Sequence, residues 1–143
     1  MTVQQISVFV ENRQGKLVEV LETLSARNID LRALSIADTS DFGILRLIVN
    51  KPEEAVKALA EADYVTSVTD VLAVSLDDTP GSLARVLRIL ADAAISVEYL
   101  YAFVAHGKGK AYVILRVEDN EKAAAVLQKK GIAFADSKDI YIM

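Results

Sequence analysis

The sequence contains two copies of one pattern, and this repeat limits the possible folds more than any other feature. The segment Asn12-Arg13-Gln14-Gly15-Lys16-Leu17 is matched by Asp78-Thr79-Pro80-Gly81-Ser82-Leu83, which lies 66 residues further along. Later in each copy the spacing becomes 68 residues, so that Leu45-x-Leu47-x-Val49 matches Val113-x-Leu115-x-Val117. The chain is therefore expected to hold two copies of one small unit, and a site built on one copy should recur on the other.

Each copy has about 70 residues, which is near the smallest size that buries a sufficient core alone. We therefore expect one domain over residues 1–70 and a second over residues 71–143, with buried surface shared between halves or subunits. No linker rich in Gly, Ser or Pro separates them, and residues 66–76 are expected to form one strand region that ends the first unit and begins the second. The similarity of residues 70–74 to residues 138–142 leaves an exchange of terminal strands open.

Composition excludes several classes of function. The net charge of −4 and a pI near 5.0 provide no concentrated basic face for nucleic acid. The chain has no cysteine, which excludes disulfides, thiolate catalysis and thiolate zinc sites. No apolar run approaches the ~18–20 residues that span a membrane, and no signal-like segment follows Met1, so we expect a cytoplasmic protein without a membrane partner.

Hydrophobic periodicity predicts the elements of the first copy. Ile6, Val8 and Val10 alternate as in a strand, and apolar residues between Leu17 and Leu24 recur as on a one-sided helix. Further strands are expected over residues 29–37, 43–49 and 65–68, with a hairpin turn over 38–41 and a second helix from residue 51.

The second copy repeats this order. Strands are expected over residues 71–76, 95–104 and 111–117, with a hairpin over 106–109, helices from Gly81 and Asn120, and a closing strand at Ile140-Tyr141-Ile142. The predicted fold class is α+β: two ferredoxin-like βαββαβ units side by side, with antiparallel sheets and helices on one face. The second strand of each copy is apolar on both faces, so we expect these strands to meet between the copies.

The loops that contain Gly15 and Gly81 are the best candidates for a site. Each lies between the end of a strand and the start of a helix, where free backbone N–H groups and the helix dipole favour an anion. Glycine permits a close approach of a ligand, and Pro80 rigidifies the second loop. Two interpretations are open here: a ligand-binding loop, or only a well-capped connection.

The polar residues of these loops also leave alternatives. Asn12 and Asp78 either cap the helices or hold a ligand ammonium group. The first loop carries Arg13 and Lys16, whereas the second carries Asp77 and Asp78 with no base nearby in the sequence. If both loops bind one class of ligand, the first should favour the more acidic one; otherwise these charges are solvated surface.

Other residues give weaker signals. His106 is the only histidine, and it lies on an expected hairpin without a nucleophile and an acid to form a triad. The acids show no zinc-ligand spacing, although Asp77 and Asp78 are suited to a weak contact with a hard cation. Tyr99 and Tyr101 share a strand face, where packing is the default role and a pocket lining the alternative. No cofactor and no bound metal are expected.

The order strand, glycine loop and amphipathic helix resembles the ACT domain family. Asp78-Thr79-Pro80-Gly81-Ser82-Leu83-Ala84 fits that family's Asp-x-Pro-Gly-x-Leu pattern closely, and the first loop fits it with Gln14 where proline is common. The resemblance covers essentially the whole chain as a tandem pair with no catalytic domain attached. In this the chain is similar to small stand-alone tandem ACT proteins of bacteria and archaea.

The resemblance implies a regulatory module that binds an amino acid between a loop of one unit and strand residues of its partner. The implied loop positions are Asn12, Arg13, Gly15, Lys16 and Leu17, together with Asp78, Pro80, Gly81, Ser82 and Leu83. The implied strand positions are Leu34, Ser35, Ile36, Tyr99, Leu100 and Tyr101.

We therefore expect a non-catalytic protein that binds a small amino acid at the interface of its two ACT units. We also expect it to form a homodimer and to signal to a separate metabolic enzyme. The alternative is a module that docks on a metabolic enzyme without any ligand. An enzyme on this scaffold is disfavoured, because cysteine is absent, histidine is single and the acids do not cluster.

Overall fold

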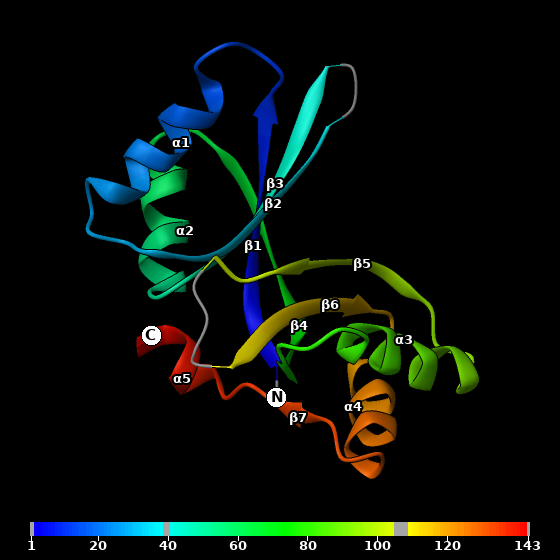
Figure 1. The fold of residues 1–143 in the computed structure, drawn as a ribbon. Helices are drawn as coiled ribbons and strands as arrows, with labels where there is room; N and C mark the ends of the chain where they lie inside the picture. Colours follow the sequence, from blue (N-terminus) through cyan, green and yellow to red (C-terminus); the bar gives the residue numbers. More distant parts are fainter. Residues whose placement is uncertain (1, 39–40, 105–108, 143) are drawn as a thin grey trace. The chain divides into compact units, whose positions relative to one another are not determined.

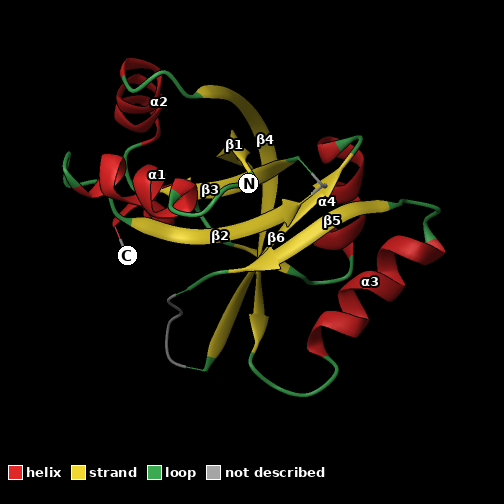
Figure 2. Cartoon of the chain, turned by 90° about the horizontal axis from the view of Figure 1, so that it is seen from above, coloured by secondary structure: helices red, strands yellow, loops and turns green. Residues whose placement is uncertain are grey.

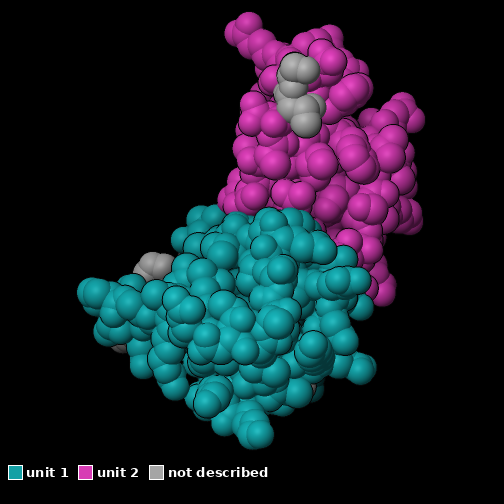
Figure 3. Space-filling model, turned by 90° about the vertical axis from the view of Figure 1, so that its right-hand side faces the viewer, with its two compact units in different colours: residues 1–3, 70–140 teal, residues 4–69, 141–143 magenta. Residues whose placement is uncertain are grey.

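The chain folds into two compact units. The computed structural model describes residues 2–38, 41–104 and 109–142 (Figures 1 and 2). Residues 4–69 and 141–143 form one unit, called here the N-terminal unit, and residues 1–3 and 70–140 form the other, the C-terminal unit (magenta and teal in Figure 3). Among the described residues, no helix is long and apolar enough to cross a membrane.

The N-terminal unit has the order βαββαβ. Its elements are β1 (Thr2–Glu11), α1 (Lys16–Ser25), β2 (Leu31–Asp38), β3 (Phe42–Val49), α2 (Pro52–Glu61) and the first part of β4 (Val65–Asp77). The strand order is β2-β3-β1-β4, and β3 is antiparallel to both β1 and β2. The helices α1 and α2 pack against each other (Figures 1 and 2).

The C-terminal unit repeats this plan. Its elements are the second part of β4, α3 (Ser82–Asp92), β5 (Val97–Ala102), β6 (Lys110–Val117), α4 (Asn120–Lys129), β7 (Ala133–Phe134) and most of α5 (Ser137–Ile142). The strand order is β7-β4-β6-β5, with antiparallel pairs throughout. The predicted α+β class and the antiparallel βαββαβ pattern are thus confirmed in each unit.

The strand β4 serves both units. It is one strand of 13 residues that ends the first βαββαβ pattern and begins the second, as expected for residues 66–76. The predicted hairpin turns are described only in part, because residues 39–40 and 105–108 lie outside the described residues. His106 lies there as well.

Each core forms where helices pack on alternate residues of the sheet. In the N-terminal unit one buried cluster joins β1 to the inner face of α1 through Ile6, Val8, Val10, Val20 and Leu24. In the C-terminal unit the equivalent positions form the second cluster: Leu72, Val74, Leu76, Val86 and Leu90. The apolar repeat of the sequence is therefore a repeat of two cores.

The helices α1 to α4 all end in the same backbone motif. A residue in the left-handed region follows each helix, and the next N–H donates to the carbonyl five residues earlier, which is the Schellman motif. The left-handed residues are Asn28, Asp63, Ala94 and Gly131, with φ of 56°, 68°, 58° and 80°. The N–H donors are Ile29, Tyr64, Ile95 and Ile132, and the acceptors are Leu24, Leu59, Leu90 and Leu127. The motif turns the chain back toward the sheet, and at the end of α2 the residue that follows the turn is Tyr64.

The end of the chain differs from the prediction. The pattern Ile140-Tyr141-Ile142 predicts a strand, whereas the structure has the helix α5, and the last strand is β7. A helix cap explains the difference: the Asp136 carboxylate accepts hydrogen bonds from Ser137 Oγ at 3.4 Å and from the Lys138 N–H at 3.2 Å. Three successive apolar residues fit either element, so the strand prediction is wrong here.

Candidate ligand-binding turns

The two glycine turns, between β1 and α1 and between β4 and α3, have the same backbone structure. Four backbone hydrogen bonds of 2.8–3.2 Å hold the first turn. In each an N–H group donates to a carbonyl oxygen: Asn12 to Asp41, Arg13 to Glu11, Lys16 to Arg13 and Glu19 to Gly15. Four of 2.8–3.3 Å hold the second, from Asp78 to Gly109, Thr79 to Asp77, Ser82 to Thr79 and Arg85 to Gly81. The duplication seen in the sequence therefore extends to the hydrogen bonds of the turns.

Glycine is required in both turns by the backbone itself. Gly15 has φ 85° and Gly81 has φ 88°, in the left-handed region that favours glycine. A Cβ added at either position would meet no other atom within 4 Å. A substitution would therefore be strained by the backbone angle rather than by a clash, and the space beside each glycine is open.

Asn12 and Asp78 do not cap the helices. The N-cap residues are Gly15 and Gly81, three positions further on, and neither α1 nor α3 has a side-chain hydrogen bond at its cap. The capping interpretation is therefore wrong, because the turn places the helix start beyond the reach of these two side chains. Their interpretation as partners of a ligand ammonium group stays a prediction.

Two backbone amides at the start of each of these helices have no backbone acceptor among the described residues. Among the described residues, the N–H groups of Leu17 and Val18 in α1 have no backbone partner, and neither do those of Leu83 and Ala84 in α3. Such amides, at the positive end of the helix dipole, are suited to an anionic group.

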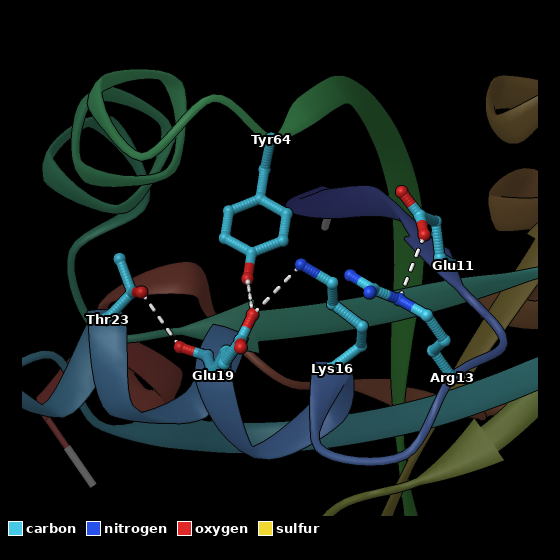
Figure 4. A network of polar contacts seen from close by, with 6 residues as sticks. All are labelled: Glu11, Arg13, Lys16, Glu19, Thr23 and Tyr64. Carbon is cyan, nitrogen blue, oxygen red and sulfur yellow. Dashed lines mark hydrogen bonds and ion pairs between the residues drawn. The ribbon is translucent and has the colours of Figure 1, made fainter.

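A polar network lies beside the first turn (Figure 4). The Glu19 carboxylate oxygen Oε2 accepts hydrogen bonds from Lys16 Nζ at 3.1 Å and from Tyr64 Oη at 3.3 Å. Arg13 Nε pairs separately with Glu11 Oε2 at 3.1 Å. Figure 4 shows that Arg13 and Lys16 leave the turn with their charged ends side by side, between Tyr64 and Glu11. The strand β1, the turn, the helix α1 and the segment after α2 thus contribute to one polar cluster.

The network shifts two pKa values. The hydrogen bond from Lys16 and its positive charge lower the pKa of the Glu19 carboxyl, and the Tyr64 hydroxyl adds to this effect. Partial burial raises the pKa of the Tyr64 hydroxyl, and the negative charge of Glu19 raises it further. Glu19 is therefore held ionised and Tyr64 neutral beside the first turn.

The second turn carries different side chains. Lys110 Nζ contacts Asp77 Oδ1 at 2.6 Å, because the antiparallel register of β4 and β6 places these two residues opposite each other. This hydrogen bond lowers the pKa of Asp77 and raises that of Lys110. The second turn has no base nearby in the sequence, but it has one in the structure. A base that is distant in sequence reaches the turn through strand pairing.

The predicted strand residues of the N-terminal unit lie away from its turn, because β3 separates β2 from β1. Leu34 packs against the core, and Ile36 extends the same face of the sheet at its edge, where 51% of it is exposed. Ser35 lies between Leu34 and Ile36 in β2 and pairs with Arg46 of β3. Because successive side chains of a strand point to opposite faces, Ser35 lies on the opposite face of the sheet.

The strand residues of the C-terminal unit are placed in the same way, because β6 separates β5 from β4. Tyr99 and Tyr101 stack with ring centroids 6.5 Å apart, and Tyr101 is largely buried. Leu100 points to the other face and is partly exposed. Within each unit, the structure therefore does not bring the predicted strand residues to that unit's own turn.

Sequence reasoning missed three aromatic residues beside the first turn. Phe9 and Phe42 are 46% and 55% exposed, and together with Tyr64 they line a hollow that also contains Lys16 and Glu19. Phe9 gave a signal in the sequence, because it occupies the solvent-facing phase of β1, where a polar residue is expected. Among the described residues, no three His, Cys, Asp or Glu side chains are grouped to hold a metal ion.

Comparison with known families agrees with this geometry. A family model described as an ACT domain pair matches residues 1–143. The chain belongs to the ACT domain family. A search of curated proteins found no match to this ACT pair.

Solved structures with the same fold extend this result. Protein BT0572 from Bacteroides thetaiotaomicron is 38% identical to this ACT pair, with a TM-score of 0.92, over 100% of this chain and 98% of that chain. The regulatory subunit of aspartate kinase from Thermus thermophilus, in a ligand-free form, is 18% identical with a TM-score of 0.63, over 88% of this chain and 90% of that one. The corresponding subunit from Thermus flavus is 20% identical with a TM-score of 0.59, over the same shares. At these identities the two kinase subunits show a common fold.

The two ACT units share the backbone of the turn but differ in the charged side chains at and after it. Lys16 in the first unit is replaced by Ser82 in the second, and Glu19 is replaced by Arg85. Of the residues predicted from the sequence, Lys16 and Ser82 line hollows at their turns. A ligand held by backbone amides would therefore meet different side chains in the two ACT units.

Proposed function

We propose that this ACT pair is a non-catalytic regulatory protein that binds a small amino acid at its glycine turns. The signal would pass to a separate metabolic enzyme, and the protein would act as a homodimer. The proposal keeps the turn residues 12–17 and 78–83 as the ligand-binding positions. The strand residues predicted from the sequence stay candidates for selecting the ligand side chain.

One observation carries the proposal: both units present the same open turn at a helix start. The amides of Leu17 and Val18, and of Leu83 and Ala84, have no backbone acceptor among the described residues. A Cβ at Gly15 or Gly81 would meet no neighbour within 4 Å. A ligand carboxylate is the small anion that these amides suit, and carboxylate or amide side chains of the turns would receive its ammonium group.

Binding would act by shifting a population of conformations. A ligand that contacts one conformation better than another stabilises it, and the coupling in ordinary allostery is about 1–3 kcal/mol. The aspartate kinase regulatory subunits of similar fold support a regulatory role by analogy of fold.

A thermal-shift screen of the twenty amino acids tests the proposal. At least one should raise the melting temperature, by an amount that grows with its concentration as mass action requires. Gly15→Asp and Gly81→Asp should together abolish the shift, because each places a negative charge beside the open amides. Gly15→Ala and Gly81→Ala are the controls for backbone strain, since they change the same positions, with φ 85° and 88°, without adding a charge.

Other outcomes would contradict the proposal. If no amino acid shifts the melting temperature and a metabolic enzyme still co-purifies, the protein is a ligand-independent docking module. Turnover of an amino acid by the pure protein would show instead that it is an enzyme.

A further inference from the structure

Both ACT units have a hollow at the same place in the fold. The first, called here the aromatic hollow, is lined by Phe9, Glu11, Lys16, Glu19, Phe42 and Tyr64 among others, and its volume is about 370 Å³. The second lies in the C-terminal unit at the equivalent residues: Ser75, Asp77, Ser82, Arg85, Lys110 and Ile132. Its volume is about 140 Å³. Of these two hollows in the described part of the chain, the aromatic hollow is the one that reaches the volume of ordinary small-molecule sites, about 300–1,000 Å³.

The walls of the aromatic hollow expose large apolar side chains to water. Phe9 and Phe42 are about half exposed, and Val65 at the start of β4 is 66% exposed. The Schellman motif at the end of α2 adds the ring of Tyr64 to this wall. An apolar group of a ligand would remove these surfaces from water, which is favourable in proportion to the area covered.

The floor of the same hollow carries charges of both signs with unused hydrogen-bonding capacity. The Lys16 ammonium has three donors, and its contact with Glu19 takes one of them. The Glu11 carboxylate forms an ion pair with Arg13 through one oxygen, Oε2, and the side chain is largely exposed. A ligand carboxylate would find Lys16, and a ligand ammonium group would find Glu11 or Glu19. A zwitterion with an apolar side chain would form ion pairs with these charged groups and pack its side chain against the aromatic rings.

The hollow of the C-terminal unit lacks these features. Ser75, Lys110 and Ile132 stand where the first unit has Phe9, Phe42 and Tyr64, so none of the described residues lines it with an aromatic ring. Its main charges are paired internally, because Lys110 contacts Asp77 at 2.6 Å and Arg85 donates to the Lys130 carbonyl at 3.1 Å. Neither its size nor its chemistry suits a ligand with an apolar side chain.

We propose that the aromatic hollow of the N-terminal unit binds a free amino acid with an apolar side chain, one molecule per chain. The ligand carboxylate pairs with Lys16, its ammonium group with Glu11 or Glu19, and its side chain packs between Phe9 and Phe42. This inference rests on the proposed function and makes it narrower: it names one of the two turns and one class of amino acid.

Titration calorimetry on the full chain tests the inference. The probes are valine, leucine and phenylalanine, compared with aspartate and lysine. An apolar amino acid should bind with one molecule per chain. Phe42→Lys and Phe9→Ser install the residues of the second unit, and each should weaken binding by about tenfold or more, as expected for losing one wall of an apolar pocket. Both residues are about half exposed, so we expect the variants to fold; their melting temperatures check this.

Lys110→Ala is the matched control, because Lys110 occupies the position of Phe42 in the other unit and its replacement should leave the affinity unchanged. Three results would each overturn the inference. They are two equal sites per chain, binding of charged amino acids alone, and full affinity in both Phe42→Lys and Phe9→Ser. Binding that survives these variants but is lost in Gly15→Asp and Gly81→Asp would overturn it and leave the proposed function standing. If no amino acid binds at all, both fail.

Discussion

Glu19 and Tyr64 make the stability of the first glycine turn sensitive to both low and high pH. The folded-state pKa of Glu19 is lowered, so its contribution to stability is present above the ordinary glutamate pKa and is lost as the pH falls through the folded value. The folded-state pKa of Tyr64 is raised, so its contribution is present below the ordinary tyrosine pKa and is lost as the pH rises through the folded value. Between the folded-state pKa values of the two groups, Glu19 is ionised and Tyr64 is a neutral hydrogen-bond donor.

Replacing Glu19 by glutamine should lower the pKa of Tyr64. The value should fall toward the ordinary 10.0 but stay above it, because burial is the larger cause of the shift and the substitution leaves burial in place. NMR titration of the Tyr64 ring signals measures this. The control is Glu22→Gln, which removes a charge from the same helix three residues away. An unchanged Tyr64 pKa in Glu19→Gln would show that the carboxylate does not act on the hydroxyl.

The aromatic residues of the first hollow show how far single residues could be predicted. Lys16 was identified because it lies within the glycine motif, where sequence spacing alone places it at the helix start. Phe9, Phe42 and Tyr64 belong to three different segments, and only strand pairing and the Schellman motif bring them together. Their proximity depends on long-range contacts that no local pattern contains.

At the scale of elements, the helix α4 begins differently from α1 and α3. The helix α4 has an acidic cap, since the Asp119 carboxylate oxygen Oδ1 accepts a hydrogen bond from the Lys122 N–H at 3.0 Å. The helices α1 and α3 begin at a glycine without such a bond. The first kind of start stabilises its helix locally, whereas the second leaves amides available.

Asp119→Ala should therefore reduce the free energy of unfolding by about 1 kcal/mol, the usual loss for an N-cap. Asp78→Ala should change it by less than about 0.5 kcal/mol, because its side chain does not cap α3. Urea denaturation measures both values. Asp119→Asn keeps the acceptor and serves as the control. A loss in Asp78→Ala as large as that in Asp119→Ala would contradict the assignment of Gly81 as the cap.

Periodic elements were predictable because their pattern is local. The alternation at Ile6, Val8 and Val10 and the helical spacing from Leu17 to Leu24 gave β1 and α1 correctly. The segment Ile140-Tyr141-Ile142 is too short for its pattern to distinguish a strand from a helix. The cap that Asp136 provides favours the helix. Short closing segments depend on their neighbours more than on their own pattern.

At the scale of the whole molecule, the strand β4 couples the two ACT units. Its 13 residues form the end of one sheet pattern and the start of the next, without a linker between them. Disordering either part of β4 removes a strand from one unit and strains the strand that remains in the other. We therefore expect the two units to unfold together, in one cooperative transition.

Leu115→Ala tests this coupling. Leu115 is fully buried in the core of the C-terminal unit, and its truncation should reduce the free energy of unfolding by about 2–5 kcal/mol. Hydrogen exchange should then be faster for the core amides of the N-terminal unit, around the equivalent Leu47. The free energy of opening derived from their exchange rates should fall by the same amount as the free energy of unfolding. Leu47→Ala, which is equally buried, is the reciprocal control. Two separate thermal transitions, or acceleration confined to the mutated unit, would show that the units unfold independently.

The division of the chain has one more consequence, because each unit contains a terminal segment from the opposite end of the sequence. Residues 1–3 belong with residues 70–140, and residues 141–143 belong with residues 4–69. A protease that cuts once at the boundary between the copies would leave two fragments, each missing a piece of its own unit and carrying a piece of the other. Neither fragment then holds all the residues of its own unit, so we expect complete folding of either copy to require the intact chain.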